Sequence, residues 1–277
     1  MLGKLIKYDF RSLGRKFAPL WAALAALAAL NGFTIRHVLG SGNFTGFLNF
    51  LLGVLPIILL IVLWAALAIM ALVFIVQRFY KGLLGDEGYL MFTLPVTNAQ
   101  HIAAKTVTAL ILLVITAVVA ALSGLLLLTV YNPQGVGDVF SAAFRVLREE
   151  PIPGQFWWIL AEAAVLCLAA VVADVLQIYA AISLGHLSKK HRGGTALLAY
   201  VGINVALSVL LSALVPALER LPLEEMSFYV DGYGVHVGKM FGAAAAVIGV
   251  GILWEVIKGA AFFLGSNAIL NRKLNLE

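Results

Sequence analysis

The chain has 277 residues, of which 62% are apolar and only 12% are charged, with a net charge of +5. An ordinary soluble domain carries about 25% charged residues, so a chain this apolar cannot cover its surface with polar groups in water. These proportions exclude a soluble globular protein and predict a membrane protein. The single cysteine, Cys167, excludes an intramolecular disulfide.

Residues 1–17, MLGKLIKYDFRSLGRKF, predict a short amphipathic helix. Its apolar residues recur every three or four positions, and its basic residues recur on the opposite side. Such a helix is suited to lie at the headgroup boundary of a membrane. The alternative is the n-region of a signal peptide, but Asp9 and the length of the segment count against it.

Six apolar runs are long enough to cross a bilayer, which takes roughly 20 residues. They cover residues 18–38, 50–76, 102–130, 157–184, 195–218 and 240–268. The sequence therefore predicts an all-α membrane protein with a single transmembrane domain, residues 1–277, whose six helices leave both termini on one side.

The positions of Lys and Arg predict which side is cytoplasmic. With the N-terminus inside, the inner segments hold thirteen of the nineteen basic residues and the outer segments hold five. Cytoplasmic loops carry an excess of Lys and Arg, so we expect both termini in the cytoplasm and the chain in the plasma membrane. This asymmetry explains the net charge without nucleic acid as a partner.

Two outer segments contain features of their own. Residues 131–156 predict one short surface helix around SAAFRVLREE. Residues 219–239 mix acidic and aromatic residues, which fits an interfacial hairpin, a half-helix or an ordered surface loop. No internal repeat is apparent, which weakens a carrier built from inverted repeats.

The segment from Gln77 to Gln100 is the most unusual connection in the chain. It follows one apolar run and precedes the next, and it contains three glycines, the Asp86–Glu87 pair and four aromatic residues. A connection that only reverses the chain needs about 2 to 8 residues. We therefore expect a structured element that contacts something else.

Motifs for catalysis are missing from the sequence. It contains no GxxxxGK[ST] phosphate loop, no HExxH, no GxSxG and no CxxC pair. The five histidines, at 37, 101, 186, 191 and 236, are scattered over both expected sides, so we predict no catalytic residue, no metal site and no cofactor in this chain.

Four ionisable residues fall within the predicted spans away from their ends: Glu162, Asp174, Glu255 and Lys258. Charged groups are costly in hydrocarbon, so they are paired or functional. A polar patch that lines or gates a path is one interpretation. The favoured one is an ion-pair cluster of Asp174 and Glu255 with Lys258, which lets the fourth and sixth helices pack. Glu162 is expected at headgroup level.

Three stretches together resemble a known family: MLGKLIKYDFRSLGRKF, RFYKGLLGDEGYLMFTLPVT and the tail Asn271–Glu277. The whole chain is similar to a permease subunit of the bacterial type-2 class of ATP-binding-cassette exporters. The resemblance implies an N-terminal interfacial helix, six transmembrane helices and a cytoplasmic coupling helix between the second and third. It also implies a dimeric pore, formed with a second permease copy, and a separate cytoplasmic ATPase subunit that binds ATP and Mg.

The resemblance implies that the coupling element covers residues 78–95. Its expected partner-binding residues are Arg78, Phe79, Tyr80, Gly85, Asp86, Glu87, Gly88, Tyr89, Phe92, Leu94 and Pro95. The chemistry agrees, because the glycines permit a sharp turn, the carboxylates can cap a helix and the apolar side chains can fill a groove.

Three functions follow as hypotheses. The leading one is a permease subunit, not itself an enzyme, that exports an apolar or amphipathic cargo such as a peptide, lipid or drug. The others are an ion- or proton-coupled secondary carrier and a non-transporting immunity or sensor protein of the membrane.

Overall fold

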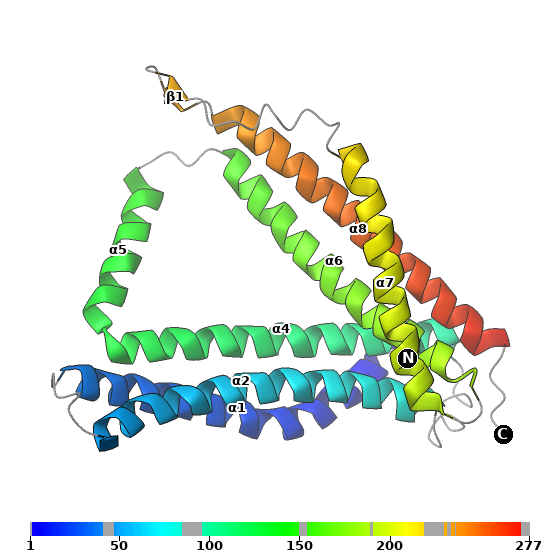
Figure 1. Ribbon diagram of the computed structural model, residues 1–277, viewed down its shortest axis with the longest axis horizontal. Helices are drawn as coiled ribbons and strands as arrows, with labels where there is room; N and C mark the ends of the chain where they lie inside the picture. The colour runs from blue at the N-terminus through cyan, green and yellow to red at the C-terminus, as the bar shows by residue number, and fades with distance from the viewer. Residues whose placement is uncertain are drawn as a thin grey trace. The chain divides into compact units, whose positions relative to one another are not determined.

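The computed structural model describes residues 2–40, 47–84, 96–149, 154–188, 191–218, 230–231, 234–235 and 237–272. In chain order the elements are α1 (Leu2–Gly40), α2 (Phe47–Phe79), the π-helical turn η1 (Tyr80–Leu84), α4 (Asn98–Tyr131), α5 (Pro133–Glu149), α6 (Gly154–Gly185), α7 (Arg192–Leu218), β1 (Val230–Asp231), β2 (Gly234–Val235) and α8 (Val237–Arg272) (Figure 1).

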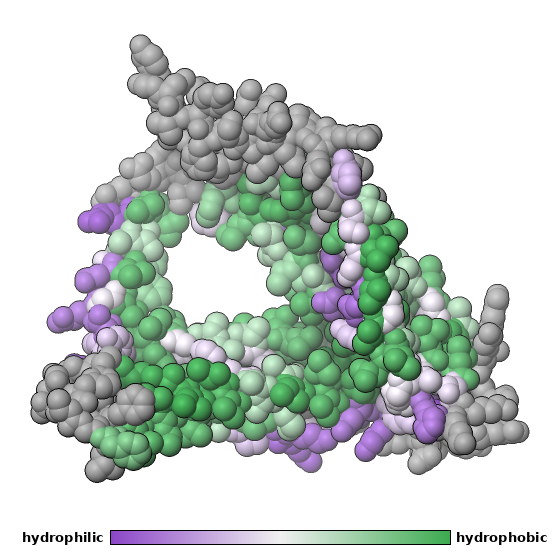
Figure 2. Space-filling view, viewed as in Figure 1, coloured by the Kyte–Doolittle hydropathy of each residue, from purple (hydrophilic) through white to green (hydrophobic). Residues whose placement is uncertain are grey.

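Six of these helices are long and apolar enough to cross a membrane, counting only the described residues. The candidate spans are Gly14–His37, Val54–Leu83, Asn98–Tyr131, Gly154–Gly185, Arg192–Ala213 and Ala244–Asn271. Each overlaps one of the six predicted runs, so the helical, multi-pass membrane architecture is confirmed. Figure 2 shows that the visible faces of these long helices are predominantly hydrophobic, as a lipid-facing surface must be.

The first two predicted elements form one helix. We expected an interfacial helix over 1–17 and a separate span over 18–38, but α1 runs without interruption from Leu2 to Gly40. At 100° per residue, Phe17 falls on the same face as Leu24 and Ala28, so the apolar stripe continues across the expected boundary. Pro19 removes one backbone hydrogen bond, which is insufficient to end the helix here.

The chain divides into two compact units, Met1–Ile75 with Val107–Pro151 and Val76–Thr106 with Ile152–Glu277. In the core of the first unit, the buried residues of α1 and of α2 recur at the same sequence intervals. Its α1 residues are Phe17, Leu24 and Ala28, its α2 residues are Leu60, Leu67 and Ala71, and Leu112 of α4 completes it. Both helices use steps of seven and four, which keeps one seam of side chains between them.

Polar contacts fix how α1 and α2 pair. The buried Asn31 side-chain amide donates to the Pro56 carbonyl oxygen at 2.8 Å. The rings of Phe17 and Phe74 meet edge-on; this contact lies earlier in α1 than Asn31 but later in α2 than Pro56, so the two helices run antiparallel. Within lipid, apolar side chains gain little by leaving hydrocarbon, so interhelical hydrogen bonds contribute noticeably to helix pairing. Each contributes about 0.6–2 kcal/mol.

The second unit is built on α6, which packs against both α7 and α8. Leu166 of α6 approaches Gly251 of α8. About two turns further along both helices, Ala173 approaches Gly259. From the first contact to the second, the residue numbers increase in both helices, so α6 and α8 run parallel. Small residues at this seam let the two backbones come close, as is typical of membrane helices.

Two connecting elements differ from the spans. In α5 the Asn132 side-chain oxygen accepts from the Gly135 backbone N–H at 3.0 Å, and Pro133 occupies the first helical turn. One side of α5 is hydrophilic and the other hydrophobic in Figure 2. The predicted helix in 131–156 is thus confirmed and begins earlier than expected. Between α7 and α8, the antiparallel pair β1–β2 matches the hairpin alternative.

Candidate functional site

The beginning of the expected coupling segment is held against α6. The Phe79 ring stacks on Tyr179 with 4.1 Å between centroids and 11° between planes, and neither side chain is exposed by more than 1%. Arg78 lies one residue earlier in α2, and Tyr80 opens η1. Phe79 is therefore buried inside the second unit and is unavailable to a partner, unlike the role that the resemblance implied for it.

A second ring contact follows immediately. Tyr80 lies 5.2 Å from His186, centroid to centroid, and His186 comes just after the end of α6. Burial, followed by the positive charge of Arg192, lowers the pKa of His186 from its ordinary value of 6.5. His186 is therefore a neutral imidazole at pH 7, packed beside an aromatic ring.

A lysine ties α4 to the end of α2. The Lys105 ammonium donates to the Arg78 carbonyl oxygen at 2.9 Å, although Lys105 is only 4% exposed. This carbonyl belongs to the last turn of α2, where the helix dipole favours positive charge. A Cβ on Gly82 would lie 2.6 Å from the Lys105 Nζ, so a larger residue there would displace the end of the lysine side chain.

The far end of the segment is capped. The Thr97 hydroxyl accepts from the Gln100 N–H at 3.3 Å, and the Gln100 side-chain oxygen accepts from the Thr97 N–H at 3.2 Å. This reciprocal capping box explains why α4 begins at Asn98. The Asn98 amide in turn donates to Asn271 of α8 at 2.6 Å. The ends of α2, α6 and α8 and the start of α4 thus meet at one end of the second unit.

The remaining predicted coupling residues, Gly85, Asp86, Glu87, Gly88, Tyr89, Phe92, Leu94 and Pro95, lie outside the described residues. Their predicted roles stay predictions. Of the three described members, Tyr80 is the most accessible, with 37% of its surface exposed.

Three of the four intramembrane ionisable residues are brought together. The Lys258 Nζ lies 2.7 Å from a Glu255 carboxylate oxygen and 3.3 Å from the Asp174 carboxylate. The side chains of Lys258 and Glu255 are 11% and 15% exposed, whereas that of Asp174 is 66% exposed. The cluster joins α6 to α8 and carries two carboxylates for one ammonium.

Glu162 lies apart from this cluster. It is half-buried on the face of α6 that also carries Leu166 and Ala173, the residues that approach α8. One of its carboxylate oxygens is buried without a hydrogen-bond partner among the described residues. A headgroup-level position remains compatible with its place near the start of α6, beside the exposed Phe156, Trp157 and Trp158.

Sequence reasoning missed the residues that anchor the segment, namely Lys105, Tyr179 and His186. Tyr179 and His186 follow an apolar run about a hundred residues later, and no periodicity links them to Phe79 or Tyr80. Lys105 had a usable signal, because a lysine within a predicted span requires a partner. Among the described residues, no group of three His, Cys, Asp or Glu side chains is arranged to hold a metal ion.

Comparison with known proteins returned no matching protein-family model, no matching curated protein and no matching solved structure.

Proposed function

We propose that this chain is the membrane-spanning permease subunit of an ATP-binding-cassette exporter. In this proposal the segment 78–95 receives the ATPase subunit in the cytoplasm, and a second permease copy completes the pore. The cargo is apolar or amphipathic.

The observation that carries the proposal is the anchoring on both sides of the segment. Its first residues are fixed by the Phe79–Tyr179 stack and by the Lys105 bond to the Arg78 carbonyl, and its last residues lead into a capped helix. A segment that transmits force between a partner and the membrane helices needs such rigid attachments. A connection that only reverses the chain does not.

The same contacts provide a route for that force. Phe79 and Tyr80 touch the end of α6, and Asn98 is bonded to the end of α8. A displacement of the segment therefore acts on α2, α4, α6 and α8 together. The sequence has no phosphate-binding loop, so in this proposal the energy comes from another chain, which the resemblance implies is an ATPase with bound ATP and Mg.

The proposal is tested with Asp86→Lys and a matched control, Asp138→Lys, which makes the same charge change on the exposed surface of α5. After gentle solubilisation, we expect a nucleotide-binding ATPase to co-purify with the wild type and the Asp138→Lys chain. The Asp86→Lys chain should be inserted and folded but lose the ATPase, since a reversed charge disrupts a docking contact.

Tyr89→Ala provides an independent variant, because it removes an aromatic anchor without changing charge. Equal recovery of the ATPase with Asp86→Lys, Tyr89→Ala and wild type would contradict the coupling role. Absence of any ATPase from the wild-type preparation would contradict the permease assignment itself.

A secondary carrier is the second candidate, and the Asp174–Lys258–Glu255 cluster favours it. Two carboxylates facing one ammonium leave room for an exchangeable proton or cation within a span. Transport by the purified chain alone in vesicles, driven by a proton gradient without ATP, would support the carrier. Strict dependence on ATP and a partner would exclude it.

A further inference from the structure

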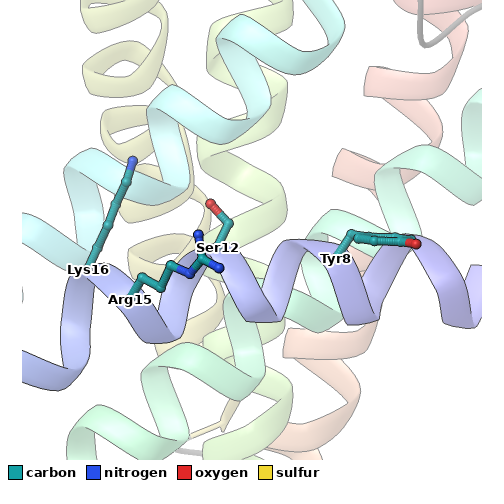
Figure 3. A pocket seen from close by; sticks show the side chains of 4 residues that line it. All are labelled: Tyr8, Ser12, Arg15 and Lys16. Carbon is teal, nitrogen blue, oxygen red and sulfur yellow. The ribbon is translucent and has the colours of Figure 1, made fainter.

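An open pocket of about 490 Å³ lies on α1, and four residues line it: Tyr8, Ser12, Arg15 and Lys16. Its size falls in the range of small-molecule sites, roughly 300–1,000 Å³. Figure 3 shows the Arg15 guanidinium beside Ser12, and Lys16 extending from α1 toward α2. The Lys16 Nζ lies 5.6 Å from the centre of the Phe74 ring, which positions the ammonium at the α1–α2 boundary.

An exposed strip of α1 lies on the same face of the helix as the pocket. Counting 100° per residue, Pro19, Ala23 and Ala26 fall within about 60° of Ser12, on the side away from Phe17 and Leu24. All three are exposed, and they are followed on the same face by Leu30 and Phe33, which are 55% and 59% exposed. The strip is thus cationic and hydroxylated at one end, narrow in the middle and bulky at its far end.

The position of the pocket relative to the candidate membrane span fits a strip that is charged at one end and apolar beyond it. The candidate span of α1 is Gly14–His37, so the pocket lies at the end of the hydrocarbon crossing. Tyr8 is about 12 Å from Lys16 along the helix axis, which matches the polar zone beside the bilayer core. The small side chains of Pro19, Ala23 and Ala26 then lie at the depth of acyl chains.

We propose that this strip binds one anionic phospholipid, with its phosphate held by Arg15 and Ser12, which lie side by side, with Lys16 and Tyr8 flanking the headgroup, and with one acyl chain along Pro19, Ala23 and Ala26 (Figure 3). The guanidinium and the Ser12 hydroxyl donate charge-assisted hydrogen bonds to the anionic phosphate oxygens, and the ammonium adds a second positive charge beside them. The small residues leave a shallow channel in which a chain lies flat against the helix.

Charge argues against a second copy of this chain on the same face. A copy related by two-fold symmetry would place its own Arg15 and Lys16 near these ones, and residues 1–17 hold five basic residues against Asp9 alone. A free phosphate would use the cationic end but would leave the strip of small residues without a role. A phospholipid uses both.

The test compares single variants by native mass spectrometry of the detergent-solubilised full chain with added phosphatidylglycerol or phosphatidylcholine. Arg15→Gln should lower the affinity for phosphatidylglycerol about tenfold, as loss of a charge-assisted bond implies. Lys7→Gln is the matched control, because Lys7 is exposed and its loss removes the same charge at a position about 140° from Ser12 around the helix. We expect it to change affinity less than twofold.

Ala23→Leu tests the channel without changing charge, and the exposed position of Ala23 avoids the helix core. It should also weaken phosphatidylglycerol binding, whereas millimolar inorganic phosphate should not compete. Equal losses in Arg15→Gln and Lys7→Gln would overturn the site in favour of diffuse surface charge. Competition by phosphate with full binding by Ala23→Leu would overturn the lipid. Crosslinking of two copies through Ala23→Cys would assign the face to a dimer instead.

Discussion

Individual polar residues inside the apolar spans define most of the specific geometry of this protein. Asn31, Lys105 and Lys258 each reach a partner on another helix, at Pro56, Arg78 and Glu255 respectively. In lipid no water is available to hydrogen-bond these groups, so a charge without a partner costs folding free energy. Substituting one member of such a pair should therefore destabilise the folded chain more than substituting both.

This asymmetry gives a prediction for the α6–α8 cluster. Lys258→Met should destabilise the folded chain by roughly 3–5 kcal/mol, because it leaves Glu255 buried without its cation. The double variant Lys258→Met, Glu255→Leu should return close to wild-type stability in a detergent unfolding assay. A double variant as unstable as the single one would contradict a purely packing role. A stable double variant that has lost transport would assign the cluster to function.

His186 predicts how the stability of the folded chain depends on pH. Its pKa is lowered in the folded chain, so the unfolded chain binds a proton more readily at mildly acidic pH. The contribution of His186 to stability is complete above a pH of about 6.5 and is lost as the pH falls through the lowered value. The thermal stability of the wild type should therefore decline more between pH 8 and pH 5 than that of His186→Gln. His191→Gln, an exposed histidine of the same connection, should follow the wild type.

At the scale of elements, the sequence predicted the spans well and their contacts poorly. Except at the start of α1, hydropathy locates the ends of the long helices within a few residues, because crossing hydrocarbon imposes length and composition on a segment regardless of its neighbours. The continuity of α1 was missed because basic and apolar stretches suggest different environments, although the apolar stripe through Phe17 and Leu24 shares one face. The Phe79–Tyr179 stack depends on helix packing, which no local pattern encodes.

The α6–α7 turn offers a test at this scale. A Cβ on Gly185 would lie 2.5 Å from the Ala196 Cβ and 2.7 Å from its backbone nitrogen, so Gly185→Ala must push α7 away from α6. We expect a loss of about 1–3 kcal/mol. Gly202→Ala is the control, since nothing lies within 4 Å of its added Cβ, and it should gain up to about 1 kcal/mol in helix propensity. Equal effects of the two variants in thermal unfolding would refute the close approach.

At the scale of the whole molecule, six spans organise the chain as a multi-pass membrane protein. Charge asymmetry, a property of the whole sequence, predicts the orientation. The candidate docking segment was predicted from its length and composition. Its attachments at Lys105, Tyr179 and Asn271 required the structure, because they join helices far apart in sequence.

Orientation is measurable by cysteine labelling. Cys167 is the only native cysteine, so Cys167→Ala gives a clean background. Lys81→Cys and His191→Cys, both at exposed positions, should react with an impermeant maleimide only when the cytoplasmic face is open. Ser141→Cys on α5 should react in intact cells. Labelling of all three from one side would contradict the predicted topology.

The continuity of α1 has a mechanical consequence. Its 39 residues make a rod of about 58 Å, nearly twice the thickness of the hydrocarbon core. A rod whose middle packs on α2 through Phe17, Leu24 and Ala28 is a lever whose fulcrum is that seam. Any change of tilt imposed at Arg15 therefore reappears, inverted, at His37 on the opposite side of the membrane.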